Sequence, residues 1–386
     1  MKNLPSDSRW RGWKRGELQI HFIHAGVGES LFWIFPDGTT MLLDCGATDT
    51  RGREPAPVLP DASRPAGDWV ARYVTRVNPA ADKTRVDIMM LSHYHADHTH
   101  GFPAAAETLH FTRAFDRAWP ECDDPCRISD YDQDGSLAVM RKLYADLVAR
   151  DGLVVEKFVE GRRDQVRMLH GGAEGFSIFN LCANGRMADE RTGEITDLYQ
   201  DYPDRQPGFS GKQWINENGM SLGMIVRYGA FSFFTAGDFS DKAQMPEGFE
   251  RFEIEDRLAT VAPPVSLAKM NHHGYFAMPE KLVKALRPRA WVNGVWTHRQ
   301  NSADTIRRLA DRALYPGDRA ICPTFMPPER PCSDVPDPAY GGAHVVVSAP
   351  PGGETFSISF LSATDESMRV LAVNEYASGA DDHFAQ

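Results

Sequence analysis

The feature that most constrains this chain is a group of histidines and an aspartate directly after an apolar stretch. Residues 86–92 (VDIMMLS) form a predicted buried strand, and His93, His95, Asp97 and His98 follow it at once. Imidazole nitrogens and carboxylate oxygens are ligands that suit zinc and related divalent ions. Strand ends in α/β proteins are also where ligand-binding groups collect. This spacing therefore predicts a metal site in the loop after the strand.

The rest of the sequence predicts one α/β domain. Apolar segments typical of strands, such as 17–24, 30–36 and 40–46, are followed by a segment of helical spacing at 68–77. The chain has 386 residues, 42% of them hydrophobic, and shows no internal repeat or low-complexity linker, so we expect a single domain over 1–386. We interpret two polar regions as insertions, residues 110–165 and 184–214. We also expect extra strands in the C-terminal part of the chain.

Composition disfavours several classes of protein. No window approaches the ~18 to 20 apolar residues that a membrane helix needs, and no apolar run follows the basic N-terminal residues as in a secretory signal. We therefore expect a cytoplasmic protein with no membrane partner, whose six scattered cysteines are reduced. The net charge of −11 opposes long-range attraction to nucleic-acid backbones, which disfavours a general nuclease.

The segment 93–98 (HYHADH) resembles the HxHxDH hallmark of the metallo-β-lactamase superfamily. The resemblance implies an α/β fold with a four-layer αββα sandwich and a centre of two divalent metal ions, zinc first and manganese as the alternative. It implies that His93 and His95 hold one metal, whereas Asp97 and His98 hold the other. A simpler role for Asp97, as the cap of the next helix, stays open.

Three other segments resemble further positions of the superfamily. Asp44, in MLLDCG, matches an aspartate that supports the metal-bearing loop, with a turn residue as the alternative. Asp238, after FSFFTAG, matches an aspartate that bridges the two cations, with a strand-ending turn residue as the alternative. The segment KMNHHG contributes His272 or His273 to the second metal, and spacing alone does not choose between them.

One position departs from the superfamily pattern. A third histidine for the first metal is expected between the HxHxDH segment and Asp238, but the corresponding segment NLCANG contains none. His170, in RMLHGG, is the best substitute candidate, with an ordinary loop histidine as the alternative. Without a substitute, the first metal would be held weakly or completed by water.

Candidate substrate contacts lie in or near the same motif-bearing turns. They are Tyr94, Asn218, His298 and Arg299, each with packing, capping or surface exposure as the alternative. Lys269 precedes the HHG turn on a predicted buried strand, so its ammonium either snorkels to the surface or binds an anion.

A narrower resemblance, over roughly residues 18–310, is to the hydrolase domain of the competence protein ComEC. The matching segments are HFIHAGVGESLFWIFPDGTTMLLDCG, NENGMSLGMIVRYGAFSFFTAGD and HHG followed by a helix. The resemblance implies hydrolysis of a phosphodiester, in nucleic acid or a small molecule. Two cations can share a water, lower its pKa and polarise the bond under attack, while Asp97 and Asp238 offset the metal charge.

Two other functions remain open at this stage. The same cation pair would serve a lactone, ester, thioester or β-lactam hydrolase, because it polarises a carbonyl equally well. A non-catalytic metal-bound sensor or interaction module is the third hypothesis, motivated by the absent histidine and the expected insertions. The sequence indicates no particular protein partner.

Overall fold

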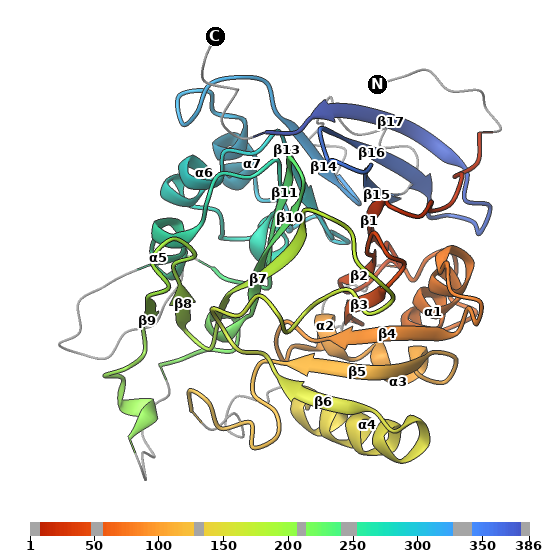
Figure 1. Cartoon of the computed structure of the whole chain (residues 1–386), viewed down its shortest axis with the longest axis horizontal. Helices are drawn as coiled ribbons and strands as arrows, with labels where there is room; N and C mark the ends of the chain where they lie inside the picture. Colours follow the sequence, from red (N-terminus) through yellow and green to blue (C-terminus); the bar gives the residue numbers. More distant parts are fainter. Residues whose placement is uncertain are drawn as a thin grey trace.

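Two β-sheets form the centre of the structure, a computed structural model that describes residues 8–47, 57–126, 135–206, 214–240, 253–326 and 342–379 (Figure 1). One sheet has nine strands in the order β17-β16-β15-β1-β2-β3-β4-β5-β6. The other has eight strands in the order β14-β13-β12-β11-β10-β7-β8-β9. Each sheet contains a parallel part, β3 to β6 in the first and β11 to β14 in the second, beside antiparallel strands.

The elements have the following bounds. The first sheet consists of β1 (Leu18–Phe22), β2 (Ser30–Ile34), β3 (Thr40–Cys45), β4 (Arg85–Met90), β5 (His110–Asp116), β6 (Val154–Lys157), β15 (Ala343–Ala349), β16 (Thr355–Ser362) and β17 (Val370–Ala377). The second consists of β7 (Phe176–Ala183), β8 (Arg186–Ala188), β9 (Ile195–Asp197), β10 (Gly223–Tyr228), β11 (Phe231–Ala236), β12 (Leu267–Lys269), β13 (Ala290–Asn293) and β14 (Ala320–Pro323). The helices are α1 (Ala66–Val77), α2 (Ala96–Thr99), α3 (Phe102–Ala105), α4 (Ser136–Asp151), α5 (Ile254–Val261), α6 (Glu280–Leu286) and α7 (Ala303–Ala310). Short 3₁₀ turns are η2 (Pro203–Arg205), η3 (Asn218–Met220) and η4 (Asn271–Gly274).

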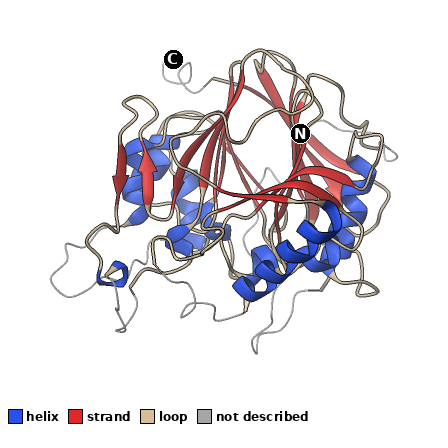
Figure 2. Ribbon diagram, turned by 60° about the horizontal axis from the view of Figure 1, so that its bottom comes forward, coloured by secondary structure: helices blue, strands red, loops and turns tan. Residues whose placement is uncertain are grey.

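Three hydrophobic cores separate four layers. The first core lies between the two sheets and joins Trp33 of β2 to Phe233 of β11, whose ring centroids are 5.5 Å apart. The second core joins the first sheet to α1, α3 and α4, and the third joins the second sheet to α5, α6 and α7. Helices therefore cover the outer face of each sheet, as Figure 2 shows. The predicted four-layer αββα sandwich is confirmed.

Side-chain alternation explains why central strands of the sheets contain continuous apolar runs. In β3, Met41 and Leu43 face the core between the sheets, whereas Leu42 faces the core under the helices. A strand places successive side chains on opposite faces, so a sheet that is covered on both faces requires apolar residues at every position. The same rule applies in β11, where Phe233 and Phe234 enter different cores.

Residues 110–165, which the sequence suggested to be an insertion, contribute regular elements to the first sheet. The segment supplies β5 and β6, which extend the first sheet in parallel at its edge, and α4, which packs against the outer face. The two strands mix polar with apolar side chains and were not predicted. Residues 127–134, in the polar loop of this segment, lie outside the described residues. Residues 184–214 include β8 and β9 at the edge of the second sheet.

The lengths of the helices and the state of the cysteines can be read from the structure. In the described part of the chain, none of the helices combines the length and apolar character needed to cross a bilayer. The five cysteines in that part are buried and unpaired: Cys45, Cys122, Cys126, Cys182 and Cys322.

Candidate metal centre

The predicted site residues come together where parallel strands of both sheets end. Asp44 lies near the end of β3, and His93 follows β4, which pairs in parallel with β3. In the second sheet, Asp238 follows β11, and the adjacent parallel strand β12 leads to His273 in η4. Parallel strands present their carboxyl ends at one edge, so residues far apart in sequence meet there.

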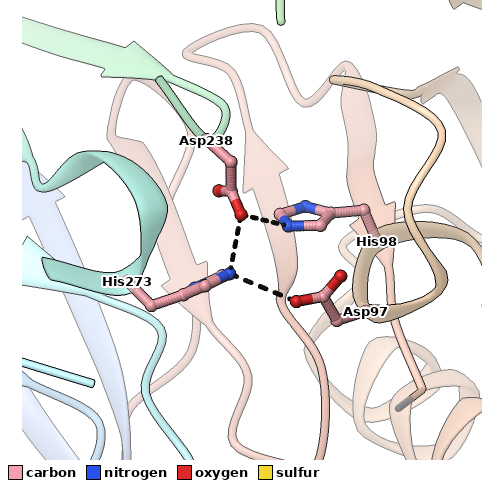
Figure 3. A group of neighbouring side chains, drawn as sticks. All are labelled: Asp97, His98, Asp238 and His273. Carbon is pink, nitrogen blue, oxygen red and sulfur yellow. Dashed lines mark hydrogen bonds and ion pairs between the residues drawn. The ribbon is translucent and has the colours of Figure 1, made fainter. Parts of the chain in front are cut away.

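Four of these residues form a compact cluster. One side-chain atom each from Asp97, His98, Asp238 and His273 lies within 4.8 Å of the others. Asp238 Oδ2 lies 3.2 Å from His98 Nε2 and 3.1 Å from His273 Nε2, which is itself 3.6 Å from Asp97 Oδ2 (Figure 3). Tetrahedral zinc with bonds of about 2.0–2.1 Å places its ligand atoms about 3.3 Å apart. The cluster could therefore hold a single cation with little rearrangement.

Two atoms of the cluster are buried without the partners that such atoms normally have. Asp238 Oδ1 and His273 Nε2 make no hydrogen bond within the described residues. His273 Nε2 approaches Asp238 Oδ2 closely, but not in a geometry that makes a hydrogen bond. Buried polar atoms in native proteins are nearly always satisfied, so these atoms fit the role of ligands to an ion.

Charge is concentrated in the cluster. Burial opposes the charged form of His98, but the Asp238 and Asp44 carboxylates outweigh burial and raise the pKa of His98 well above its usual value. Burial likewise opposes the charged form of His273, and Asp238 outweighs it, so the pKa of His273 is also raised. Burial favours protonation of Asp238, but His273 and His98 hold the pKa of Asp238 well below its usual value. The carboxylates thus attract positive charge, which a proton or a metal ion can supply.

Asp44 supports the histidine loop through three hydrogen bonds. Its Oδ2 accepts from His98 Nδ1 at 2.8 Å and from the Ser92 hydroxyl at 2.6 Å, and its Oδ1 accepts from the Ser92 N–H at 2.7 Å. The bond to His98 leaves Nε2 of that ring directed at Asp238. A carboxylate that fixes the ring and tautomer of a ligand histidine is a common feature of metal sites. This placement agrees with the supporting role that the sequence suggested for Asp44.

His93 and His95 form a pair beside the cluster. His93 Nε2 lies 3.1 Å from His95 Nδ1, a separation that also suits two ligands of one cation. The ring centroids of His93 and His98 are 4.2 Å apart, so the pair adjoins the four-residue cluster. His95 is the N-cap residue of α2 and makes no side-chain capping hydrogen bond, and Asp97 lies in the first turn of this helix.

No third histidine completes the His93–His95 pair within the described residues. Asn184, directly after β7, is hydrogen-bonded to the buried Arg117 at 2.8 Å. Arg117 in turn pairs with Glu217, at 2.6 Å between Nη2 and Oε2. Glu217 Oε1 also accepts the Tyr94 N–H at 2.7 Å, so this ion pair holds the backbone of the histidine loop. Glu217 precedes the NG turn of η3, and no motif around it indicated this role.

His170, the substitute candidate, lies away from the cluster. Its Nε2 is hydrogen-bonded to Asp87 Oδ2 at 2.8 Å, and its N–H donates to Asp37 at 2.7 Å. Asp87 is six residues before His93, and a strand of that length spans about 20 Å. His170 therefore lies near the opposite ends of the strands, as the alternative of an ordinary loop histidine predicted.

The predicted substrate contacts have different locations. Tyr94 is 2% exposed, and its hydroxyl donates to Asp116, so it faces the interior rather than a substrate. His298 is exposed, with its ring centroid 5.6 Å from that of Phe325. Asn218 contacts a motif residue, since its Nδ2 lies 3.4 Å from His272 Nε2.

The two adjacent histidines of the HHG segment point in different directions. His273 points into the cluster, whereas His272 faces Asn218 and contacts the ring of Tyr275, at 5.8 Å between centroids. His272 Nδ1 is buried and makes no hydrogen bond within the described residues. Burial lowers the pKa of His272, so this ring is neutral. Both histidines have left-handed backbone conformations. They are adjacent in sequence, so spacing alone could not show which of them enters the cluster.

The loop that carries these histidines is strained and held by one buried carboxylate. Four of its non-glycine residues have positive φ angles, which L-residues rarely adopt: His272 (47°), His273 (52°), Phe276 (49°) and Met278 (63°). Glu255, buried on α5, accepts the Asn271 side-chain N–H at 2.8 Å and the Met278 backbone N–H at 3.0 Å. One residue thus holds both ends of the loop, and strain of this kind collects at functional sites.

Lys269 does not snorkel to the surface, which was one of the two alternatives. Its side chain is 1% exposed and lies 3.0 Å from Glu29 Oε1 in the loop between β1 and β2. Glu29 was not predicted as part of the site, because a carboxylate in the turn-like segment AGVGES resembles an ordinary exposed loop residue.

Comparisons with known proteins add similarities in structure. No protein-family model matches the sequence, and no curated protein matches it either. The chain is similar to a diphosphatase from the PhnP family, at 9% identity and a TM-score of 0.36, over 79% of this chain and 94% of that chain. It is similar to MEM-A1, a subclass B3 metallo-β-lactamase from a soil metagenome library, at 11% identity and a TM-score of 0.35, over 80% of this chain and 87% of that chain. It is also similar to CmlA, a diiron β-hydroxylase from Streptomyces venezuelae, at 13% identity and a TM-score of 0.37, over 80% of this chain and 53% of that chain. Likeness at this level carries no functional argument, so function has to be argued from the site.

Proposed function

We propose that this chain is a metal-dependent hydrolase that cleaves a phosphodiester bond. The observation that carries the proposal is the buried cluster of Asp97, His98, Asp238 and His273, whose ligand atoms lie within 4.8 Å of one another. Two imidazoles and two carboxylates suit zinc, and manganese is the alternative. The phosphodiester part of the proposal rests on the sequence resemblance to the ComEC hydrolase domain.

The proposed centre holds two cations in unequal sites. The cluster residues would hold one cation, and His93 with His95, which adjoin the cluster through His98, would hold the other. Burial lowers the pKa of His93 well below its usual value, and the nearby Asp238 carboxylate partly opposes this shift. Two divalent ions bound there would supply a water of lowered pKa and polarise the phosphoryl oxygen.

The side chains of this chain contribute orientation and charge. Asp44 holds His98 through Nδ1, and the Gly294 carbonyl accepts from His273 Nδ1 at 3.0 Å, so both rings present Nε2 to the cluster. Asp97 and Asp238 supply negative charge that offsets the cations. Asn218 and His272 lie beside the cluster, and we assign them contacts with substrate oxygens.

The first experiment is metal content by mass spectrometry, followed by turnover of a bis-aryl phosphodiester with added zinc or manganese. We expect bound metal and metal-dependent cleavage in the wild type, and a loss of both in Asp238→Ala. His170→Ala is the matched control, because His170 lies near the opposite ends of the strands and should leave both properties intact.

Other outcomes would contradict parts of the proposal. Hydrolysis confined to carboxylic esters or lactones would exclude the phosphodiester substrate and retain the metal-dependent hydrolase. Tight metal binding with no turnover on either class would favour a sensor or interaction module. A reconstituted wild type that binds no metal would contradict the metal centre itself.

A further inference from the structure

A buried ion pair lies directly beside the candidate metal centre. Glu29 Oε1 and Lys269 Nζ are 3.0 Å apart, and both side chains are almost fully buried. Lys269 also donates to the carbonyls of Ala236 at 3.0 Å and Met270 at 3.3 Å, so all three of its N–H groups have acceptors. The pair thereby ties the loop between β1 and β2 to the ends of β11 and β12, from which Asp238 and the HHG segment continue.

Stability alone is a weak explanation for this pair. Removing two charges from water costs several kcal/mol for each ion, and apolar residues of similar volume often serve as well or better. A buried ion pair directly beside the candidate metal centre therefore indicates a further role. The neighbours of the Glu29 carboxylate and backbone show what that role is.

Glu29 contacts both halves of the cluster. Its backbone N–H donates to the Asp97 carbonyl at 2.8 Å, and its own carbonyl accepts the Gly46 N–H at 2.9 Å. On the other side, its Oε2 lies 3.3 Å from His273 Nδ1. Gly46 permits this packing, because a Cβ at that position would lie 1.7 Å from the Asp97 carbonyl oxygen. One residue thus connects the Asp97 loop of the first sheet to His273 of the second.

The same carboxylate lies against the His273 ring. Nδ1 donates to the Gly294 carbonyl at 3.0 Å, and Glu29 Oε2 lies 3.3 Å from Nδ1 without making a hydrogen bond within the described residues. Both oxygens favour the neutral ring with its proton on Nδ1, through the hydrogen bond in one case and through negative charge in the other. The lone pair of Nε2 then points at Asp238 and Asp97. Gly294 gives Glu29 the necessary space, since a Cβ there would lie 3.0 Å from Glu29 Oε2.

We propose that Glu29 is a positioning residue of the metal centre and that Lys269 is the counter-ion that keeps its carboxylate in place. This inference rests on the proposed metal function. The carboxylate fixes the ring and tautomer of His273, while the backbone of the same residue fixes Asp97. Residues that orient metal ligands in this way typically change metal affinity by about 10–100-fold when they are replaced.

The test uses cobalt(II), whose visible absorption reports the geometry of its ligands. Glu29→Gln alone leaves Lys269 buried without its partner, so the main variant is the double substitution E29Q/K269M, which removes both charges at similar volume. Gly294→Ala is a second variant, because its methyl group would press on Glu29 Oε2 without changing any charge. The control is R72M/E366Q, which removes an ion pair between α1 and the loop before β17. Near-ultraviolet circular dichroism checks that each variant is folded.

We expect E29Q/K269M and Gly294→Ala to bind one cobalt ion about 10–100-fold more weakly, with an altered spectrum, and the control to resemble the wild type. A merely structural pair would change the melting temperature and leave the spectrum of bound cobalt unchanged. A folded E29Q/K269M variant with wild-type cobalt affinity and spectrum would overturn the positioning role. If that variant does not fold, wild-type cobalt affinity and spectrum in Gly294→Ala would overturn it. A wild type that binds no cobalt would instead refute the proposed metal function, and the positioning role with it.

Discussion

At the scale of single residues, Asp238 is the centre of the cluster. One of its oxygens lies within about 3 Å of both His98 and His273, and the other has no hydrogen-bond partner within the described residues. An imidazole has only one lone pair to offer, whereas a carboxylate can serve two partners at once. Asp238 is thus the side chain that links the two histidines of the cluster.

The two adjacent histidines of the HHG segment should have different roles. His273→Ala removes a cluster ligand, so we expect metal content to fall by about one ion per chain, because the three remaining ligands form an incomplete site. His272→Ala should retain the metal and lower turnover, since His272 faces Asn218 outside the cluster. Metal content and phosphodiesterase rate, measured on both variants, check this prediction. Equal metal loss in both variants would contradict it.

Metal binding should release protons. The pKa values of His98 and His273 are raised, so both rings are protonated in the metal-free protein near neutral pH. A ligating imidazole must be neutral, and cation binding therefore displaces roughly two protons per chain. Affinity should accordingly rise with pH up to the raised pKa values and fall as acid is added.

Calorimetric titration of zinc in two neutral buffers of different ionisation enthalpy measures this release. We expect the apparent binding enthalpy to depend on the buffer in the wild type and to depend on it less in His273→Ala. A wild type whose binding enthalpy is the same in both buffers would show that the rings are already neutral.

At the scale of elements, the loop from Asn271 to Met278 depends on its neighbour α5. Glu255→Ala removes a buried acceptor from two donors, each of which would then be buried without a partner. We expect a loss of about 3 kcal/mol in the free energy of unfolding, together with weaker metal binding. Denaturant unfolding and metal titration measure the two effects. Glu280→Ala, at an exposed position on α6, is the control and should change neither.

The elements that bear the motifs were predictable because their signals are local. The strand before His93 is a continuous apolar run, and the turns after β4, β11 and β12 carry their histidines and aspartates at short spacing. β5 and β6 were missed, since each mixes polar with apolar residues. Glu29 and Glu255 were also missed, because their partners are far away in sequence and their own segments resemble ordinary loop and helix residues.

At the scale of the whole molecule, the candidate centre depends on the packing of two sheets. Asp97 and His98 follow β4 of the first sheet, whereas Asp238 and His273 follow β11 and β12 of the second. The sequence resemblance implied this sandwich, but it could not give the distances between the halves. Those distances are set by the core between the sheets, in which Trp33 packs on Phe233.

A cation held between the sheets should therefore stabilise the whole fold. Ligand that binds only the folded chain adds about 4 kcal/mol when its free concentration is 1,000 times Kd, because unfolding must release it. Removing metal with a chelator should lower the melting temperature of the wild type and of His170→Ala equally, since His170 lies outside the cluster. His273→Ala should show a smaller shift, because it lacks a ligand from the second sheet. Scanning calorimetry with and without chelator provides the measurement, and an equal shift in all three proteins would mean that the stabilising ion binds elsewhere.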